Sequence, residues 1–397
     1  MKRILIVSQH FPPERSGNAS RIYDMSVNLS KSGLDVTVAS PPPSFPHGAF
    51  ERTWEPISHR TVNGVKNVRL WTWQPSSRDP SFLSRISYYI LFPINVLLWT
   101  FANQRKFDVI ITSSPPLFTG IPGFFSKKIL GKKWIMDVRD RWIDASISLG
   151  FLKEGSLYEK LSRRFERLCY SNSDLIAVTT KELGRRISNS EAIQEKLILV
   201  PNGVDTDSFY PFNVRKENQV IYAGNIGYAQ DLDKVILAIS DITDNYNLKM
   251  LLVGDGDTRG QLEQLVKEKG LEDRVIFTGI VPRENVPEMI SKSLMGLAPL
   301  RKMETLEYAV PTKAYEYMAC GIPFVGCGDG EISNLAKESG GGIIADNTPE
   351  AIAKAIIKLL NNPTKIEKMG SNGRIYVKKN FDRKSIAQRF MQKIEQI

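Results

Sequence analysis

The chain has 397 residues, of which 42% are hydrophobic and 24% charged, which is enough for two domains with complete cores and ordinary for a soluble globular protein. The net charge of +10 favours an anionic partner such as a sugar nucleotide, a lipid phosphate or an anionic membrane surface. Zinc-finger spacing and RNA-recognition signatures are absent from the sequence, so we expect no nucleic-acid partner. Three cysteines without a CxxC pair and three scattered histidines argue against a disulfide framework and a metal site, and indicate a reducing, cytoplasmic compartment.

The N-terminal segment predicts a strand, a loop and a helix. Ile4–Val7 is an apolar run typical of a buried parallel strand and too short for a signal peptide. A loop rich in Pro, Ser and Gly follows, then helical periodicity over residues 19–30. Because the loop after the first strand of an open parallel sheet lies at the ligand-binding edge, Gly17 and Asn18 are candidate substrate-binding residues, with a plain turn as the alternative.

The next region contains the most apolar segment of the chain. Residues 41–79 show little periodicity and are expected to form a loop. Residues 86–102 follow, a 17-residue stretch interrupted by Pro93, at the lower limit for a membrane span. A helix lying in the membrane interface, with its Tyr and Trp residues at headgroup level, fits better. The alternative is a buried helix that covers the sheet.

A charged sequence, DVRDRW, ends the strand expected from Lys133 onward. It places Asp137, Arg139 and Asp140 at the carboxyl end of a parallel strand, where ligands bind. Asp137 and Asp140 are therefore candidates for accepting the proton of an acceptor hydroxyl or for orienting it. A structural salt bridge at the strand end is the alternative.

A second strand-and-helix series starts after the segment VPNGVD, which ends at Asp205. The expected domains are therefore 1–205 and 206–382. The strand Gln219–Ala223 leads into Gly224 and Asn225, a glycine-containing turn of the kind that cradles phosphate. A later GxGxxxG cluster does not match the dinucleotide-binding fingerprint GxGxxG.

The segment VPTKAYEYMACGIPFV predicts a short helix with a polar face. Lys313 and Glu316 are three residues apart and share that face, and Thr312 is suited to cap the helix start. Backbone N–H groups and Lys313 would meet phosphate, while Glu316 would accept hydroxyl groups. An ordinary amphipathic helix is the alternative.

Two of these segments carry a family resemblance. EYMACGIP resembles the EAMACGxP segment of retaining glycosyltransferases of family 4, and PNGVD resembles the interdomain junction of that family. The resemblance implies the GT-B fold: α/β, with two doubly wound Rossmann-like domains that face a cleft and a C-terminal helix, residues 383–397, that returns to the N-terminal domain. It also implies that the C-terminal domain binds the donor, that Glu316 binds its ribose hydroxyls, and that no metal or cofactor takes part.

The sequence departs from the family pattern at several positions. Arg139 stands where the family usually has a histidine near the reacting carbon, and Asn225 where it commonly has an arginine. Tyr308 occupies the position of a second glutamate, a role that Glu304, or less favourably Glu307, could fill.

The positive charge for a diphosphate must then come from a different set of residues. Gln230 or Asp231 lies near the position of a family lysine that grips the diphosphate. Lys313, backbone N–H groups, Lys234 and Arg301 are the groups that could replace it.

The resemblance is greatest to surface-polysaccharide enzymes of the O-antigen, capsule and fucosamine transferase kind. It implies transfer of an N-acetylated amino sugar from a UDP-sugar to a lipid-linked acceptor, by an enzyme bound peripherally to the inner face of the plasma membrane. Two alternatives stay open: a UDP-sugar 2-epimerase on the same architecture, and a non-catalytic protein that binds nucleotide or lipid.

Overall fold

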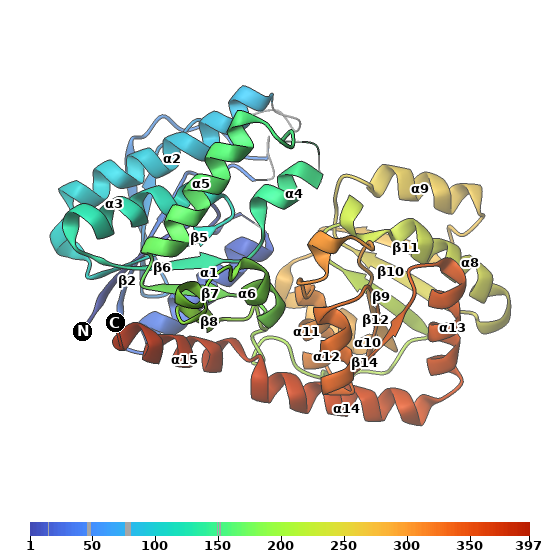
Figure 1. Ribbon diagram of the computed structural model, residues 1–397. Helices are drawn as coiled ribbons and strands as arrows, with labels where there is room; N and C mark the ends of the chain where they lie inside the picture. Colours follow the sequence, from blue (N-terminus) through green and yellow to red (C-terminus); the bar gives the residue numbers. More distant parts are fainter. Residues whose placement is uncertain (15, 46–48, 76–80, 149, 151) are drawn as a thin grey trace. The chain divides into compact units, whose positions relative to one another are not determined.

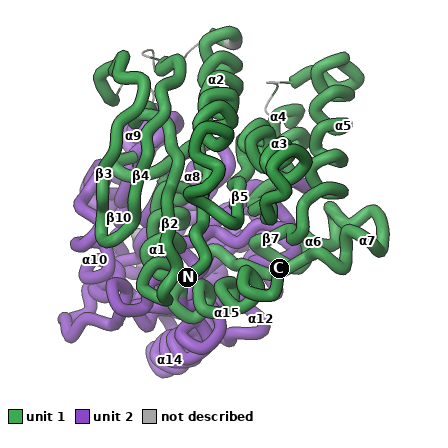
Figure 2. The backbone as a smooth tube through the Cα atoms, turned by 90° about the vertical axis from the view of Figure 1, so that its left-hand side faces the viewer, with its two compact units in different colours: residues 1–202, 383–397 green, residues 203–382 purple. Residues whose placement is uncertain are grey.

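The computed structural model describes residues 1–397 apart from residues 15, 46–48, 76–80, 149 and 151 (Figure 1). The chain divides into two compact units (Figure 2). Unit 1 comprises residues 1–202 and 383–397, and unit 2 comprises residues 203–382. The division lies close to the boundary expected after residue 205, and the C-terminal helix belongs to unit 1, where it packs against the first helix.

Unit 1 is built on an eight-stranded sheet with the order β3-β4-β2-β1-β5-β6-β7-β8, in which β3 and β4 pair antiparallel and the other neighbours are parallel. Its strands are β1 (Arg3–Val7), β2 (Asp35–Ser40), β3 (Ile57–Val62), β4 (Val65–Leu70), β5 (Val109–Ser114), β6 (Lys133–Val138), β7 (Leu175–Val178) and β8 (Leu197–Leu199). Its helices are α1 (Gly17–Lys31), α2 (Phe82–Ala102), α3 (Gly120–Leu130), α4 (Trp142–Ser148), α5 (Leu157–Asn172), α6 (Lys181–Ile187), α7 (Glu191–Gln194) and α15 (Arg383–Glu395).

The hairpin of β3 and β4 corrects the loop expected over residues 41–79, of which 46–48 and 76–79 lie outside the described residues. Its turn is Asn63-Gly64, and both residues have positive φ, 47° and 81°, as a tight hairpin turn requires. Most of β3 is exposed, so this strand lacks the alternation of buried and exposed positions that would reveal it in the sequence. The Asn-Gly pair was the available signal.

Helices cover both faces of the unit 1 sheet. On one face, α1 and α15 pack with β-strand residues such as Ile135 in a single apolar core. On the other face, α3 packs against β5, β6, α2 and α5. The approach of α3 to the sheet is close, because a Cβ atom at Gly123 would lie 2.2 Å from the indole nitrogen of Trp134.

Unit 2 is built on a six-stranded parallel sheet with the order β11-β10-β9-β12-β13-β14. From β9 the chain adds β10 and β11 on one side of the sheet, and it then returns to add β12, β13 and β14 on the other side. The carboxyl ends of β9 and β12 are therefore the topological switch point. The strands are β9 (Gln219–Ala223), β10 (Lys249–Val253), β11 (Val275–Gly279), β12 (Met295–Ala298), β13 (Phe324–Cys327) and β14 (Gly342–Ala345). The helices are α8 (Leu232–Tyr246), α9 (Arg259–Glu268), α10 (Val286–Lys292), α11 (Thr312–Ala319), α12 (Glu331–Ser339), α13 (Pro349–Leu360) and α14 (Pro363–Asn380).

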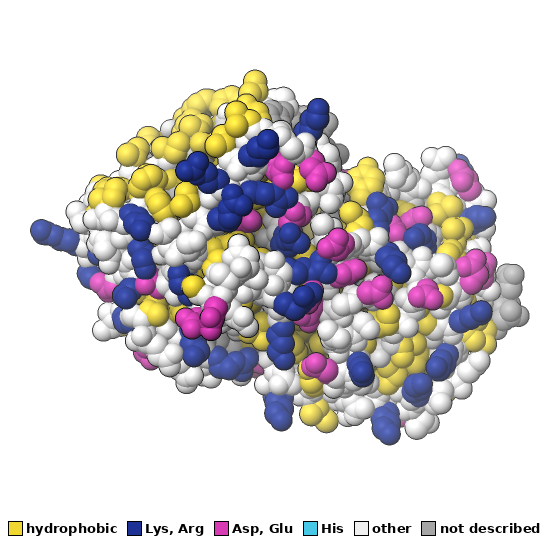
Figure 3. All heavy atoms as spheres, in the orientation of Figure 1, with side chains coloured by type: hydrophobic (Ala, Val, Ile, Leu, Met, Phe, Trp, Pro, Cys, Tyr) yellow, Lys and Arg dark blue, Asp and Glu magenta, His cyan; other side chains and the backbone are white. Residues whose placement is uncertain are grey.

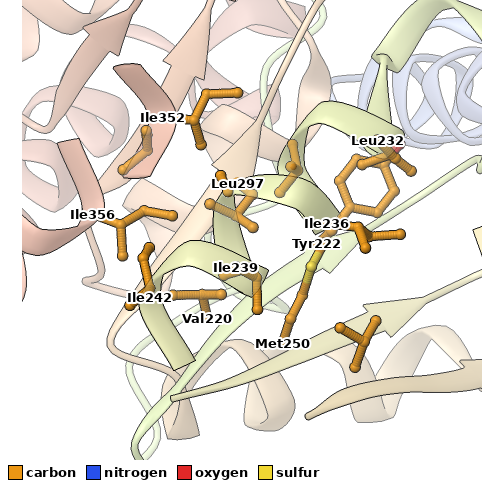
Figure 4. Packing of buried hydrophobic residues seen from close by; sticks show 14 of the residues in the cluster. Val220, Tyr222, Leu232, Ile236, Ile239, Ile242, Met250, Leu297, Ile352 and Ile356 are labelled. Atoms are coloured by element: carbon orange, nitrogen blue, oxygen red, sulfur yellow. The ribbon is translucent and has the colours of Figure 1, made fainter. Parts of the chain in front are cut away.

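The unit 2 sheet has an apolar core on each face. Figure 4 shows one of them, where Val220 and Tyr222 of β9 meet Ile236 and Ile239 of α8 and Ile356 of α13. The second core joins the sheet to α10, α11 and α12. This two-sided packing holds β9 and α11 rigidly at the switch point.

Candidate active site

The glycine-containing turn after β9 lies at the switch point of unit 2. Gly224 is exposed and has a φ of +146°, and a Cβ atom there would lie 3.1 Å from the Lys313 Cε atom. Gly254, after the neighbouring strand β10, packs even closer, since its Cβ would lie 2.0 Å from the Gly224 carbonyl oxygen. Both positions need glycine, and the backbone they form is open to a ligand.

Lys313 places a positive charge beside this turn. Its side chain is only 8% exposed, yet its ammonium group has uncharged partners: it donates to the Tyr222 hydroxyl at 3.0 Å and lies 4.3 Å from the centre of the Tyr222 ring. The Tyr222 hydroxyl in turn donates to the Asn225 carbonyl. The charge is therefore held in a fixed place, and none of the described residues supplies a carboxylate that pairs with it.

The other cations expected near the diphosphate, Arg301 and Lys234, both form ion pairs with the carboxylate of Asp231. Asp231 is buried and accepts from Arg301 Nε at 2.6 Å, Lys234 Nζ at 3.0 Å and Asn347 Nδ2 at 2.8 Å. Burial alone would raise the pKa of Asp231, but these hydrogen bonds outweigh burial and leave the pKa below its ordinary value. Arg301 and Lys234 are thus partly neutralised, unlike Lys313.

Asn225 and Gln230 differ in exposure and in role. Asn225 is exposed beside Gly224, where it can meet a ligand. Gln230 accepts from the Gly227 backbone N–H at 3.2 Å and so shapes the turn.

The N-cap residue of helix α11 lies one position earlier than expected. Pro311 is the N-cap, no side chain caps the helix, and Thr312 is its first residue, which corrects the capping role we assigned to Thr312. Proline has no side-chain oxygen that could cap the helix, and the Ala314 N–H already donates to the Pro311 carbonyl at 3.0 Å, so the N–H groups of Thr312 and Lys313 are the ones left for a ligand. Glu316 is partly buried one turn after Lys313, and no side chain of the described residues donates to its carboxylate.

In unit 1, Asp137 has a closed set of partners. Arg21 donates to both carboxylate oxygens, at 2.6 and 2.9 Å, and the Ser113 hydroxyl donates at 2.7 Å. Arg21 and Asp137 are both buried. This geometry is that of a structural ion pair, the alternative considered for this strand end, and it engages both oxygens of the Asp137 carboxylate within the protein.

Arg139 lies at the end of the same strand, and some of its N–H donors have no hydrogen-bond partner among the described residues. Its Nη2 donates to the Pro115 carbonyl at 2.9 Å, but Nε and Nη1 are shielded from solvent without a hydrogen-bond partner among the described residues. Burial lowers the pKa of Arg139 to about 10, against the opposing influence of Asp137 and Asp140, so the side chain remains charged near neutral pH. Asp140 is partly exposed next to it.

Gly17 and Asn18 lie at the start of α1, which Ser16 caps by accepting from the Ala19 N–H at 3.1 Å. A Cβ atom at Gly17 would meet nothing within 4 Å, so local packing does not require glycine there.

Two family models match the chain. The glycosyl transferase 4-like domain covers residues 16–203, and the model named glycosyl transferases group 1 covers residues 205–376. The chain belongs to the group 1 glycosyltransferases.

Individual relatives of this glycosyltransferase span most or all of its length. The putative colanic acid biosynthesis glycosyl transferase WcaI of Escherichia coli K12 is 24% identical over 414 residues, which cover 99% of each chain. A component of the phosphatidylinositol N-acetylglucosaminyltransferase of Arabidopsis thaliana is 22% identical, over 90% of this chain and 74% of its own. The structure of Anabaena HepE with UDP-glucose matches with a TM-score of 0.70 at 16% identity, over 100% of both chains. The fold is GT-B.

The second family glutamate has no direct substitute in this glycosyltransferase. Tyr308, at its position, is buried with 2% exposure. Glu304 is exposed in a short 3-10 helix, Glu304–Leu306, and Glu307 is partly buried, its backbone carbonyl accepting from the Glu331 N–H at 2.8 Å. The structure therefore leaves Glu304 as the more accessible of the two candidates.

One hydrogen-bonded pair in the loop after β1 was missed from the sequence. Glu14 is buried, its Oε2 lies 2.7 Å from His10 Nδ1, and its Oε1 accepts from the backbone N–H groups of Ser44 and Phe45. The pair ties the loop after β1 to the segment after β2. A His and a Glu four residues apart in a loop gave only a weak sequence signal.

Proposed function

We propose that this chain is a retaining, metal-independent glycosyltransferase that moves an N-acetylated amino sugar from a UDP-sugar to a lipid-linked acceptor in surface glycan synthesis. The observation that carries the proposal is the uncompensated Lys313 ammonium beside the open Gly224 turn at the switch point of unit 2. A fixed cation next to exposed backbone is suited to a diphosphate.

The residues of unit 2 divide the work of donor binding. Lys313, the open N–H groups at the start of α11 and the Gly224 turn bind the diphosphate, with Arg301 at the periphery. Glu316 accepts the ribose hydroxyls. As the bond from the anomeric carbon to the phosphate oxygen breaks, the leaving diphosphate gains negative charge, and Lys313 stabilises that charge without a metal ion.

In unit 1, Asp140 and Arg139 form the acceptor side of the reaction. The acceptor hydroxyl attacks the anomeric carbon from the face that the diphosphate leaves, which retains the configuration, and its proton passes to the departing phosphate oxygen or to a carboxylate. Asp140 is the more accessible carboxylate, because it is partly exposed whereas Asp137 is buried and bound by Arg21. Gly17 and Asn18, in the first turn of α1, border this acceptor.

The named relatives support the chemistry proposed. One relative's name refers to colanic acid biosynthesis, another to N-acetylglucosamine transfer and phosphatidylinositol, and a solved structure of the same fold holds UDP-glucose. A UDP-sugar donor and a lipid-linked acceptor agree with these names and with the net charge of +10.

We further propose that the enzyme is cytoplasmic and peripheral at the inner face of the plasma membrane, with α2 as the contact. Among the described residues, one helix, Leu83–Ala102, has the length and apolar composition of a membrane span. Tyr88, Phe92 and Val96 are buried on one side of it, while Leu98 on the other side is 64% exposed. A helix buried along one side suits the membrane interface better than a span.

A thermal-shift series tests the donor and a transfer assay tests the reaction. UDP and UDP-N-acetylglucosamine should raise the melting temperature by mass action, and GDP and NAD should not. Transfer of sugar to an added lipid diphosphate acceptor should follow, with UDP as product. Interconversion of UDP-sugars without acceptor would identify an epimerase instead, and nucleotide binding without any turnover would identify a non-catalytic binding protein.

A further inference from the structure

The exposed surface of α2, α3 and α5 lacks negative charge. These three neighbouring helices lie on one face of the unit 1 sheet, with α3 packed against both α2 and α5. In Figure 3, hydrophobic and basic side chains lie together over this part of unit 1. The exposed residues in the described part of the three helices are apolar, uncharged polar or basic: Leu83, Ile94, Leu98, Ala102, Phe125, Lys128, Ile129, Leu157, Tyr158, Lys160, Leu161, Arg164, Arg167, Leu168 and Ser171.

Helix α5 shows the pattern most clearly. Leu157, Leu161 and Leu168 form an apolar stripe at helical spacing, with exposures of 69%, 55% and 42%. An amphipathic helix of a soluble domain normally turns such a stripe inward.

The charges of α5 are sorted by sign. Its carboxylates turn inward: Glu159 is buried and accepts from Arg163 at 2.6 Å, and burial raises the pKa of Glu166. Lys160, Arg164 and Arg167 remain exposed, and the described residues provide no ion-pair partner for any of the three. The outer face of α5 is therefore both apolar and cationic.

We propose that α2, α3 and α5 together form a surface that binds an anionic phospholipid membrane, with α5 supplying the charge. Apolar side chains interleaved with Lys and Arg are typical of helices that lie at the headgroup level, where the leucines enter the acyl boundary and the cations meet phosphate. The proposal extends the membrane contact from α2 to two further helices. It rests on the proposed function in one respect, because a lipid-linked acceptor would explain why the enzyme binds a membrane.

A second copy of the chain fits this surface poorly. In a two-fold dimer the same patch meets itself, so Lys160, Arg164 and Arg167 would meet a surface whose described exposed residues include cations but no carboxylate. The like charges would oppose association, whereas an anionic bilayer complements them.

Cosedimentation of the full chain with lipid vesicles tests the proposal. Vesicles of phosphatidylcholine and phosphatidylglycerol should bind the protein, neutral phosphatidylcholine vesicles should bind it much more weakly, and salt should reduce the difference. The triple substitution Lys160→Gln, Arg164→Gln, Arg167→Gln should weaken binding to anionic vesicles by roughly a hundredfold. The matched triple Lys354→Gln, Lys358→Gln, Lys368→Gln, which removes the same charge from exposed positions of unit 2, should leave binding unchanged.

A second pair of variants tests the apolar stripe. Leu157→Ser with Leu161→Ser should reduce binding to anionic vesicles by about tenfold or more. Ile375→Ser, at a 66% exposed site in α14, is the control and should have no effect. Circular dichroism and melting temperature establish that each variant is folded.

Two results would overturn the proposal: vesicle binding that the α5 variants leave unchanged, or a concentration-dependent dimer that those variants abolish. Transfer to a detergent-solubilised acceptor separates this failure from failure of the enzyme function. Active protein that does not bind vesicles contradicts only the surface, and vesicle-bound protein without transfer contradicts only the proposed reaction.

Discussion

The carboxyl ends of the two sheets carry buried charge in opposite arrangements. In unit 1, Arg21 and Asp137 neutralise each other through two hydrogen bonds. In unit 2, the Lys313 ammonium is also buried but, in the described part of the chain, has the hydroxyl and ring of Tyr222 as its partners. A buried ion pair stabilises the fold, because removing one partner leaves the other charge buried and unpaired. A charge held by neutral groups serves binding, because its strongest interaction is left for the ligand.

The largest effect should come from breaking the buried ion pair. Arg21→Met leaves the Asp137 carboxylate buried without its cation and should lower the free energy of unfolding by about 3–5 kcal/mol, measured by urea denaturation. The exposed Arg185, which pairs with Glu182 at 2.7 Å, is the control, and Arg185→Met should lower the free energy of unfolding far less.

A double substitution checks the explanation for Arg21→Met. Adding Asp137→Leu removes the stranded charge and should restore much of the lost stability. No recovery in the double variant would mean that Arg21 acts through its hydrogen bond to the Val200 carbonyl rather than through Asp137.

Removing Lys313 should lower activity without lowering stability. Lys313→Ala deletes a buried charge that has no counter-ion among the described residues, so the free energy of unfolding should stay the same or rise. The value of kcat/KM should fall by about 10²–10³-fold, because stabilisation of the leaving diphosphate is lost. Lys354→Ala, on the exposed side of α13, should change neither quantity. Full activity in Lys313→Ala would remove this residue from the site.

Arg139 sharpens the comparison, because it is a unit 1 charge whose donors are partly unused. Replacement by Met removes the shielded Nε and Nη1 donors, which lack acceptors, together with the Nη2 hydrogen bond to the Pro115 carbonyl, so the melting temperature should change little. If these donors meet the acceptor substrate, its KM should rise by roughly tenfold while the KM of the donor stays constant. A destabilised variant with an unchanged acceptor KM would show that Arg139 is structural.

The sequence was informative where function depends on local spacing. The two α/β series, the turn at Gly224 and the shared face of Lys313 and Glu316 follow from residues close together in the chain. The pairing of Arg21 with Asp137 joins residues that are 116 positions apart, and local periodicity carries no information about it.

The exposure of individual side chains was the second property that the sequence did not reveal. The charges of α5 were visible in the sequence, but its outward leucines appear only once packing against α3 defines which side faces the sheet. The strand β3 was missed for a related reason, since its residues are largely exposed and its Asn-Gly turn was the sole local indication. The chain thus departs from simple patterning on the outer face of α5 and at the sheet edge formed by β3.

The smallest effect should be an acid-dependent one, at the carboxylate that holds Arg301 beside the Lys313 site. Because the hydrogen bonds of Asp231 lower its pKa below that of the unfolded chain, they contribute stability above the unfolded-state pKa, and this contribution is lost as pH falls through the folded-state pKa. Asp231→Asn should therefore lower stability near neutral pH and flatten the acid limb of the stability curve, measured by thermal unfolding across the acid range. Arg301, released from Asp231, would be free to join Lys313 at the diphosphate, so the variant should bind UDP at least as tightly as the parent. Weaker UDP binding would instead mean that the Asp231–Arg301 pair orients the guanidinium for the donor, and that a partly neutralised cation can serve binding as well as an uncompensated one.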